Sequence, residues 1–70
     1  MPETPMQRQR ITESAALLRH MRLTAPSTSL GEWMSPQADI DTWAALGLVR
    51  ITGQHRCAGW VYWVPIAGSV

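Results

Sequence analysis

The amino-acid sequence predicts an α+β domain in which three short helices are followed by a two-stranded β-hairpin. Three observations support this fold class. An amphipathic helical pattern follows Thr12, and start signals for two more helices lie at residues 27–29 and 35–36. A third helical pattern ends at Gly47 and passes directly into two strand-like runs that flank a polar, glycine-containing turn. The chain has 70 residues, which is enough for one small domain of this kind.

The first helix is expected from Glu13 to about Leu23. Thr12 is a suitable N-cap, and Glu13 then lies in the first turn, where the helix dipole favours an anion. Arg19 and Arg22 are expected on the outer side of this helix. Its apolar residues recur at helical spacing and are expected to face the core: Ala15, Leu17, Leu18 and Met21.

Two shorter helices are expected next. Pro26 ends the first helix because a proline disfavours helical geometry in its predecessor. The Ser-Thr-Ser sequence that follows offers a new N-cap for a helix from Leu30 to Met34. Ser35 followed by Pro36 is another start signal, since proline fits the first helical position. The third helix is expected from Pro36 to about Leu46, with Ile40, Trp43, Ala44 and Leu46 on its buried side.

The hairpin is expected directly after this helix. Gly47 suits a helix C-cap, a position that often needs a positive φ angle. Within Leu48 to Thr52, Val49 and Ile51 alternate with Arg50 and Thr52. Trp60 to Val64 is dense in aromatic and β-branched residues. Gly53 to Gly59 forms the turn between them. Pro65 ends the second strand because proline cannot donate a hydrogen bond to the sheet.

Composition and the chain ends limit the function classes. Six arginines and five carboxylates leave a formal net charge of +1, so no strong overall field favours nucleic acid. No apolar run is long enough to span a membrane, and no apolar signal segment is seen, so a cytoplasmic protein is expected. We expect a flexible arm at residues 1–10, one domain at residues 11–65 and a loose tail at residues 66–70.

Metal binding and catalysis are not expected. His20, His55 and Cys57 are the soft metal ligands of the chain, and they do not make the four-ligand set of a structural zinc site. The same residues lack the orienting group and oxyanion donors that a nucleophilic pair needs. No glycine-rich phosphate loop is present. The sequence therefore predicts a protein without metal, cofactor or enzymatic activity.

The order of these elements resembles the winged helix-turn-helix family of small bacterial and phage transcriptional regulators. The resemblance depends on the serine-rich cap before Leu30 to Met34, on the Leu-Gly-Leu-Val junction at residues 46–49, and on an aromatic closure at Trp60 or Tyr62. It covers about Ile11 to Pro65. It implies a third helix that contacts duplex DNA and a hairpin that acts as a basic wing.

Duplex DNA is accordingly the first expected partner, and transcription regulation the first expected function. Arg8 and Arg10 in the arm, like other exposed arginines, suit phosphate contacts. Backbone amides at the start of the third helix also suit a phosphate, and Gln37 can pair with adenine. Helix capping and an exposed hairpin tip explain the same residues equally well. The candidate DNA-binding residues are Arg19, Arg22, Ser35, Gln37, Thr42, Arg50, Gln54, His55 and Arg56.

The alternative function is a phage-type interaction protein that docks on a host protein and inhibits it. Asp39 and Asp41 make the third helix acidic, and carboxylates repel phosphate. The second strand has aromatic residues on both faces, and a two-stranded hairpin cannot bury both. One face is expected to serve a homodimer or a protein partner, unless the arm or an added strand covers it. The candidate interface residues are Asp39, Asp41, Trp60, Val61, Tyr62 and Trp63.

Overall fold

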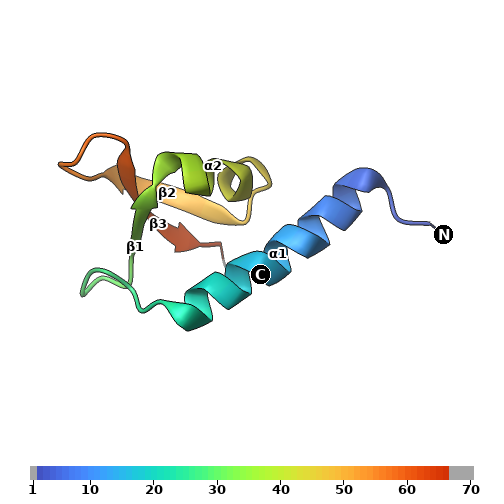
Figure 1. The fold of residues 1–70 in the computed structure, drawn as a ribbon, viewed down its shortest axis with the longest axis horizontal. Helices are drawn as coiled ribbons and strands as arrows, with labels where there is room; N and C mark the ends of the chain where they lie inside the picture. Colours follow the sequence, from blue (N-terminus) through green and yellow to red (C-terminus); the bar gives the residue numbers. More distant parts are fainter. Residues whose placement is uncertain (1, 67–70) are drawn as a thin grey trace.

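The computed structural model describes residues 2–66 and contains two helices and one antiparallel sheet (Figure 1). The α+β class is as expected, but three helices followed by a two-stranded hairpin is wrong for the described residues. The sheet has three strands in the order β1-β3-β2. The expected tail lies outside the described residues except for Ile66. In chain order the elements are α1 (Pro5–Leu23), β1 (Trp33–Pro36), α2 (Gln37–Ala45), β2 (Val49–Gln54) and β3 (Trp60–Pro65).

Helix α1 begins much earlier than predicted. The Thr4 hydroxyl accepts a hydrogen bond from the Gln7 amide at 3.1 Å, and Gln7 Oε1 accepts one from the Thr4 amide at 2.8 Å. This reciprocal pair is a capping box, and Pro5 follows it at the start of the helix. The predicted start after Thr12 is therefore wrong, and residues 5–10, expected in a flexible arm, belong to the helix. Its predicted end at Leu23 is confirmed.

The short helix predicted from Leu30 to Met34 is wrong. The amides of Ser27 and Thr28 both donate to the Glu32 carbonyl, and Gly31 has a φ angle of 82°, so this segment turns instead of starting a helix. The chain then enters β1, where Trp33 lies opposite Trp63 of β3. Stacking of these two indoles, with ring centroids 5.2 Å apart, favours the strand over the local helix signal.

Helix α2 closely matches the third predicted helix, but its start differs. Pro36 is the N-cap residue and makes no side-chain cap. Ser35 lies in β1 and is 7% exposed, so its predicted capping role is wrong. At the other end, Leu46 is the C-cap and Gly47 is the residue after it. Gly47 has a φ angle of 73°, so the positive φ angle predicted for this glycine is confirmed, one position beyond the cap.

The predicted hairpin is confirmed as the β2–β3 pair, and β1 adds a third strand. Ile51 pairs with Trp63, and the register shifts at a bulge between Ile51 and Gly53. Because of this bulge, β2 continues to Gln54, two residues beyond the predicted strand end. Strand β3 is central, since β1 pairs along its other edge.

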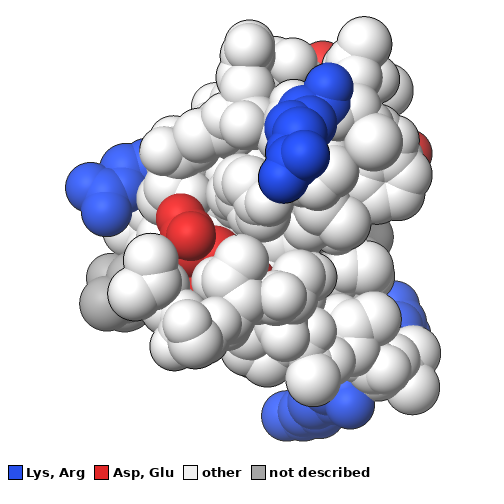
Figure 2. Space-filling model, turned by 90° about the vertical axis from the view of Figure 1, so that its left-hand side faces the viewer, with Lys and Arg blue, Asp and Glu red and all other residues white. Residues whose placement is uncertain are grey.

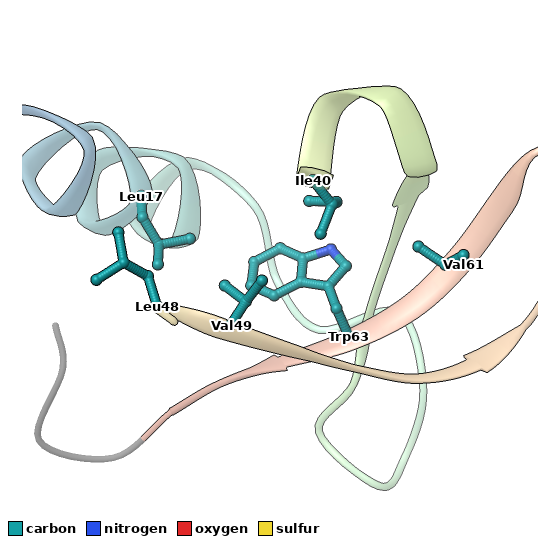
Figure 3. Packing of buried hydrophobic residues seen from close by; sticks show 6 residues of the cluster. All are labelled: Leu17, Ile40, Leu48, Val49, Val61 and Trp63. Carbon is teal, nitrogen blue, oxygen red and sulfur yellow. The ribbon is translucent and has the colours of Figure 1, made fainter. Parts of the chain in front are cut away.

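The core lies on one side of the sheet. Figure 3 shows Leu17 from α1 and Ile40 from α2 on the same side as Val61 and Trp63 of β3. Leu17 is the buried residue of α1, whereas the predicted core residue Ala15 is exposed. The six buried apolar residues are Leu17, Ile40, Leu48, Val49, Val61 and Trp63.

Candidate interaction surfaces

The side of the sheet away from the helices is the first candidate surface. Residues of β3 alternate between the two sides, so Val61 and Trp63 are buried while Trp60, Tyr62 and Val64 point the other way. Both helices contribute their buried side chains to the Val61 and Trp63 side (Figure 3). Trp60 remains 38% exposed and Tyr62 is half-buried.

Neighbouring strands extend this surface. Cross-strand partners share a face, and Met34 lies opposite Tyr62 while Pro36 lies opposite Trp60. Arg50 lies opposite Val64 and is exposed at the edge. We call this surface the open sheet face, and it comprises Met34, Pro36, Trp60, Tyr62 and Val64.

Polar side chains border the open sheet face. The His55 ring packs edge-on against Tyr62, with centroids 5.5 Å apart. The Thr52 hydroxyl donates to the Glu32 carboxylate, and this bond spans the central strand, since it joins β2 to the residue before β1. Arg50 makes no ion pair among residues 2–66. The guanidinium of Arg50 is therefore exposed and in no ion pair among the described residues.

The predicted protein-interface residues of β3 separate into two pairs. Trp60 and Tyr62 belong to the open sheet face. Val61 and Trp63 lie in the core, and the Trp63 indole nitrogen donates to Ser35 Oγ at 3.0 Å. The buried pair is therefore not available to a partner, and the Ser35 hydroxyl predicted for DNA is engaged inside the fold.

The predicted wing residues also differ in what they can contact. Gln54 is the last residue of β2 and is exposed, and Arg56 is exposed in the loop that follows. His55 is half-buried, and its Nδ1 accepts a hydrogen bond from the Cys57 amide at 3.0 Å. Only Gln54 and Arg56 are thus free to reach a ligand without breaking a contact of the turn.

Helix α2 presents an anionic outer side. Gln37, Asp39, Asp41 and Thr42 are all exposed, in agreement with the expectation that they lie near solvent. The helix contains no arginine, so nothing on it offsets the two carboxylates. A phosphate backbone close to this helix would be repelled.

The arginines that were predicted to contact DNA do not lie together on one surface of the molecule. Arg19 and Arg22 are exposed on α1, whereas Arg50 and Arg56 belong to the sheet and its loop. Arg10 is bound internally, because its guanidinium donates to the Leu46 carbonyl at the end of α2. On the side of the molecule in Figure 2, the arginines form separate groups, with uncharged surface and an acidic group between them.

The first turns of α1 form a surface that the sequence analysis missed. The N-terminal half of the helix extends beyond the sheet and α2 (Figure 1), and the molecule is 46 Å long but only 22 Å and 18 Å across. Met6 is 62% exposed and Ile11 57%. The Thr4-Pro5-x-Gln7 capping box is the sequence signal that reveals this part of the helix.

The part of the chain that the structure describes has no cluster of side chains suited to a metal ion. Residues 2–66 contain no group of three or more His, Cys, Asp or Glu side chains able to hold a metal ion. Cys57 is an exposed free thiol. Within the same residues, no helix is both long enough and apolar enough to cross a membrane.

Comparison with known proteins gives no relative: the chain matches no family model, no curated protein and no solved structure. Membership of the winged-helix family therefore stays a prediction from the sequence, and the architecture that it implied is wrong for the described residues.

Proposed function

We propose that this chain is a small interaction protein that binds a protein partner through the open sheet face. The observation that carries this proposal is the position of Trp60 and Tyr62, side by side on the side of the central strand that neither helix of the described residues covers. Aromatic residues next to aliphatic ones on an exposed surface are enriched at protein interfaces and often supply most of the binding energy.

The chemistry of the surface favours a protein over nucleic acid as its partner. Met34 and Val64 add apolar area that bases and phosphates do not require, and Arg50 is the one cation at the edge. The partner we infer has an apolar patch that covers Trp60 and Tyr62 and a carboxylate that pairs with Arg50. Such a pair at the edge fixes orientation more than it adds affinity.

Duplex DNA is the second candidate partner. The observation in its favour is that Arg19 and Arg22 are exposed three residues apart on one helix, with Arg56 exposed on the hairpin loop. Binding through these residues would depend steeply on salt and little on sequence. The acidic outer side of α2 opposes insertion of that helix into a groove, so DNA binding here has less support than protein binding.

The setting that we propose is the cytoplasm of a bacterium, either as a host protein or as a phage product. An exposed free thiol at Cys57 suits a reducing compartment. In this setting the protein would inhibit or redirect a partner by covering part of its surface, since no catalytic group is required for that role.

A capture experiment tests the proposal. The full chain, tagged, is incubated with bacterial lysate, with and without nuclease treatment, beside a Trp60→Ser/Tyr62→Thr variant and an Arg56→Gln control. The captured protein is then purified and its affinity for each variant is measured by titration. We expect the double variant to bind at least about 30-fold more weakly, because truncated hot spots cost about 2 kcal/mol or more. Arg56→Gln should bind like the wild type.

Two outcomes would contradict the proposal. Equal affinity of the wild type and the double variant would exclude the open sheet face as the binding surface. Capture that disappears after nuclease treatment, with direct binding of the purified chain to a DNA duplex, would favour the second candidate. Circular dichroism of each variant confirms that the fold is retained.

A further inference from the structure

Charge is divided unevenly between α1 and the rest of the chain. Helix α1 contains four arginines and one glutamate, which gives a formal charge of +3 with histidine neutral. The remaining residues contain two arginines and four carboxylates, which gives −2. The protein is thus nearly neutral as a whole but carries a basic helix attached to an acidic body.

The cations of α1 are concentrated on its outward side. Arg8, Ile11, Ala15, Arg19 and Arg22 recur at intervals of three and four residues, so they form one stripe along the helix. All five are exposed, and they lie on the side opposite the buried Leu17. We call these residues the outward stripe. It spans about 21 Å at a rise of 1.5 Å per residue.

The two charged side chains on the inward side of α1 do not neutralise this stripe. Arg10 donates to the Leu46 carbonyl, and Glu13 accepts a hydrogen bond from the Trp43 indole at 2.8 Å. The nearest carboxylate to the outward arginines is Glu3, whose oxygen is 3.8 Å from Arg8 Nε. Both of those side chains are at least half exposed, so water screens the pair.

Helix α2 offers the complementary surface. Asp39 and Asp41 are exposed on either side of the buried Ile40, so they border the two edges of the outer side of the helix. Between them the outer side carries only short side chains, those of Ala38, Thr42 and Ala45, all exposed. A helix with arginines and a few apolar residues fits against such a surface, because short side chains permit close approach.

The outward stripe cannot meet α2 of its own chain. Contacts between the two helices use the opposite side of α1, through Arg10 and Glu13. An acidic helix that meets the stripe must therefore belong to another molecule. A second copy of this chain supplies one, and a net charge of only +1 leaves little repulsion between copies.

We propose that two copies associate with the outward stripe of each α1 docked on the outer side of α2 of the other copy. The two contacts are equivalent under two-fold symmetry, so the assembly closes as a dimer. The open sheet face takes no part in this interface and remains available to a protein partner. This inference is independent of the proposed function, since a different surface carries it.

Charge reversal with complementation tests this interface. Sedimentation equilibrium of the full chain is compared for the wild type, Arg19→Glu/Arg22→Glu, Asp39→Arg/Asp41→Arg, and the control Arg50→Glu/Arg56→Glu. The control changes net charge by the same amount as the α1 variant but on a different surface. We expect each of the first two variants to dimerise at least about 30-fold more weakly, because it places like charges opposite each other.

The mixed sample provides the decisive readout. An equimolar mixture of the α1 and α2 variants restores opposite charges at both contacts, so we expect a heterodimer where each variant alone is monomeric. Formation of this heterodimer would also show that both variants are folded. Raising salt from about 50 mM to about 500 mM should weaken the wild-type dimer several-fold. A wild type that stays monomeric at every concentration, or a mixture that fails to associate, would overturn the proposal.

Discussion

The indole nitrogen of Trp63 donates a hydrogen bond to Ser35 Oγ at 3.0 Å inside the core, and this bond joins the central strand to β1. Trp63 is completely buried and Ser35 is nearly so. A buried indole N–H needs an acceptor, since leaving such a donor unpaired costs free energy. The bond therefore helps to explain why residues 33–36 pair with β3 rather than starting a helix.

Substitution of Ser35 by alanine should destabilise the protein by about 1–3 kcal/mol, because the Trp63 indole is left without its acceptor. The free energy of unfolding is measured by urea titration followed by tryptophan fluorescence. Ser29→Ala, at an exposed position in the preceding turn, is the control and should change stability by less than about 0.5 kcal/mol. Equal effects at the two positions would show that the buried bond contributes little.

The capping box of α1 makes a second prediction. Thr4→Ala removes the acceptor for the Gln7 amide and should cost about 0.5–2 kcal/mol of local helix stability. We expect amide hydrogen exchange to accelerate in residues 5–9, which precede the contact of Arg10 with the Leu46 carbonyl. Thr12→Ala is the matched control, since Thr12 is internal to the helix and alanine favours helix formation. If exchange accelerates in the Thr12 variant instead, the result would support a helix that starts after Thr12, as the sequence predicts.

The elements that local signals define were predicted well. Helix α2 and the β2–β3 hairpin follow from apolar spacing, from Gly47 at the helix end and from the aromatic run before Pro65. Strand β1 was missed because its stability comes from pairing with β3, about thirty residues away, and the serine-proline signal beside it predicts a helix. The start of α1 differs from the prediction because Thr12 is also a suitable N-cap beside the amphipathic pattern, whereas the capping box of Thr4 and Gln7, with Pro5 at the first helical position, lies two turns earlier.

The candidate surfaces were only partly predictable for a related reason. Aromatic residues on both sides of β3 indicate that one side stays open, but alternation alone does not tell which one. That choice depends on where Leu17 and Ile40 dock, which is a property of the tertiary fold. The basic stripe on α1 depends likewise on knowing that residues 5–10 are helical and that Arg10 faces inward.

Gly47 provides a third prediction. Its φ angle of 73° lies in the region that disfavours side chains, so Gly47→Ala should cost about 1 kcal/mol. Strain rather than a clash is the cause, because an added Cβ would lie 4.0 Å from its nearest neighbour, an ordinary contact. Gly53→Ala is the control. The φ angle of that glycine is not positive, and a Cβ added there would also lie 4.0 Å from its nearest neighbour. Thermal unfolding of both variants measures the difference, and a Gly53 variant as unstable as the Gly47 variant would contradict this account.

The hydrogen bond between the Trp43 indole and the Glu13 carboxylate makes a fourth prediction, about how α1 is held against α2. A double-mutant cycle with Glu13→Ala and Trp43→Phe isolates this bond, because phenylalanine keeps an aromatic ring but removes the donor. We expect a coupling energy of about 1 kcal/mol, measured by urea unfolding, since the acceptor is charged and the pair is partly buried.

The exposed Arg8–Glu3 pair serves as the control cycle, with both residues replaced by alanine. Water screens this ion pair, so its coupling should lie within about 0.5 kcal/mol of zero. A coupling at Glu13 and Trp43 no larger than that of the control would mean that Leu17 and Arg10 hold α1 in place without this bond. A clear difference would mean that Glu13, although it lies on a basic helix, fixes the orientation in which the outward arginines face away from their own α2.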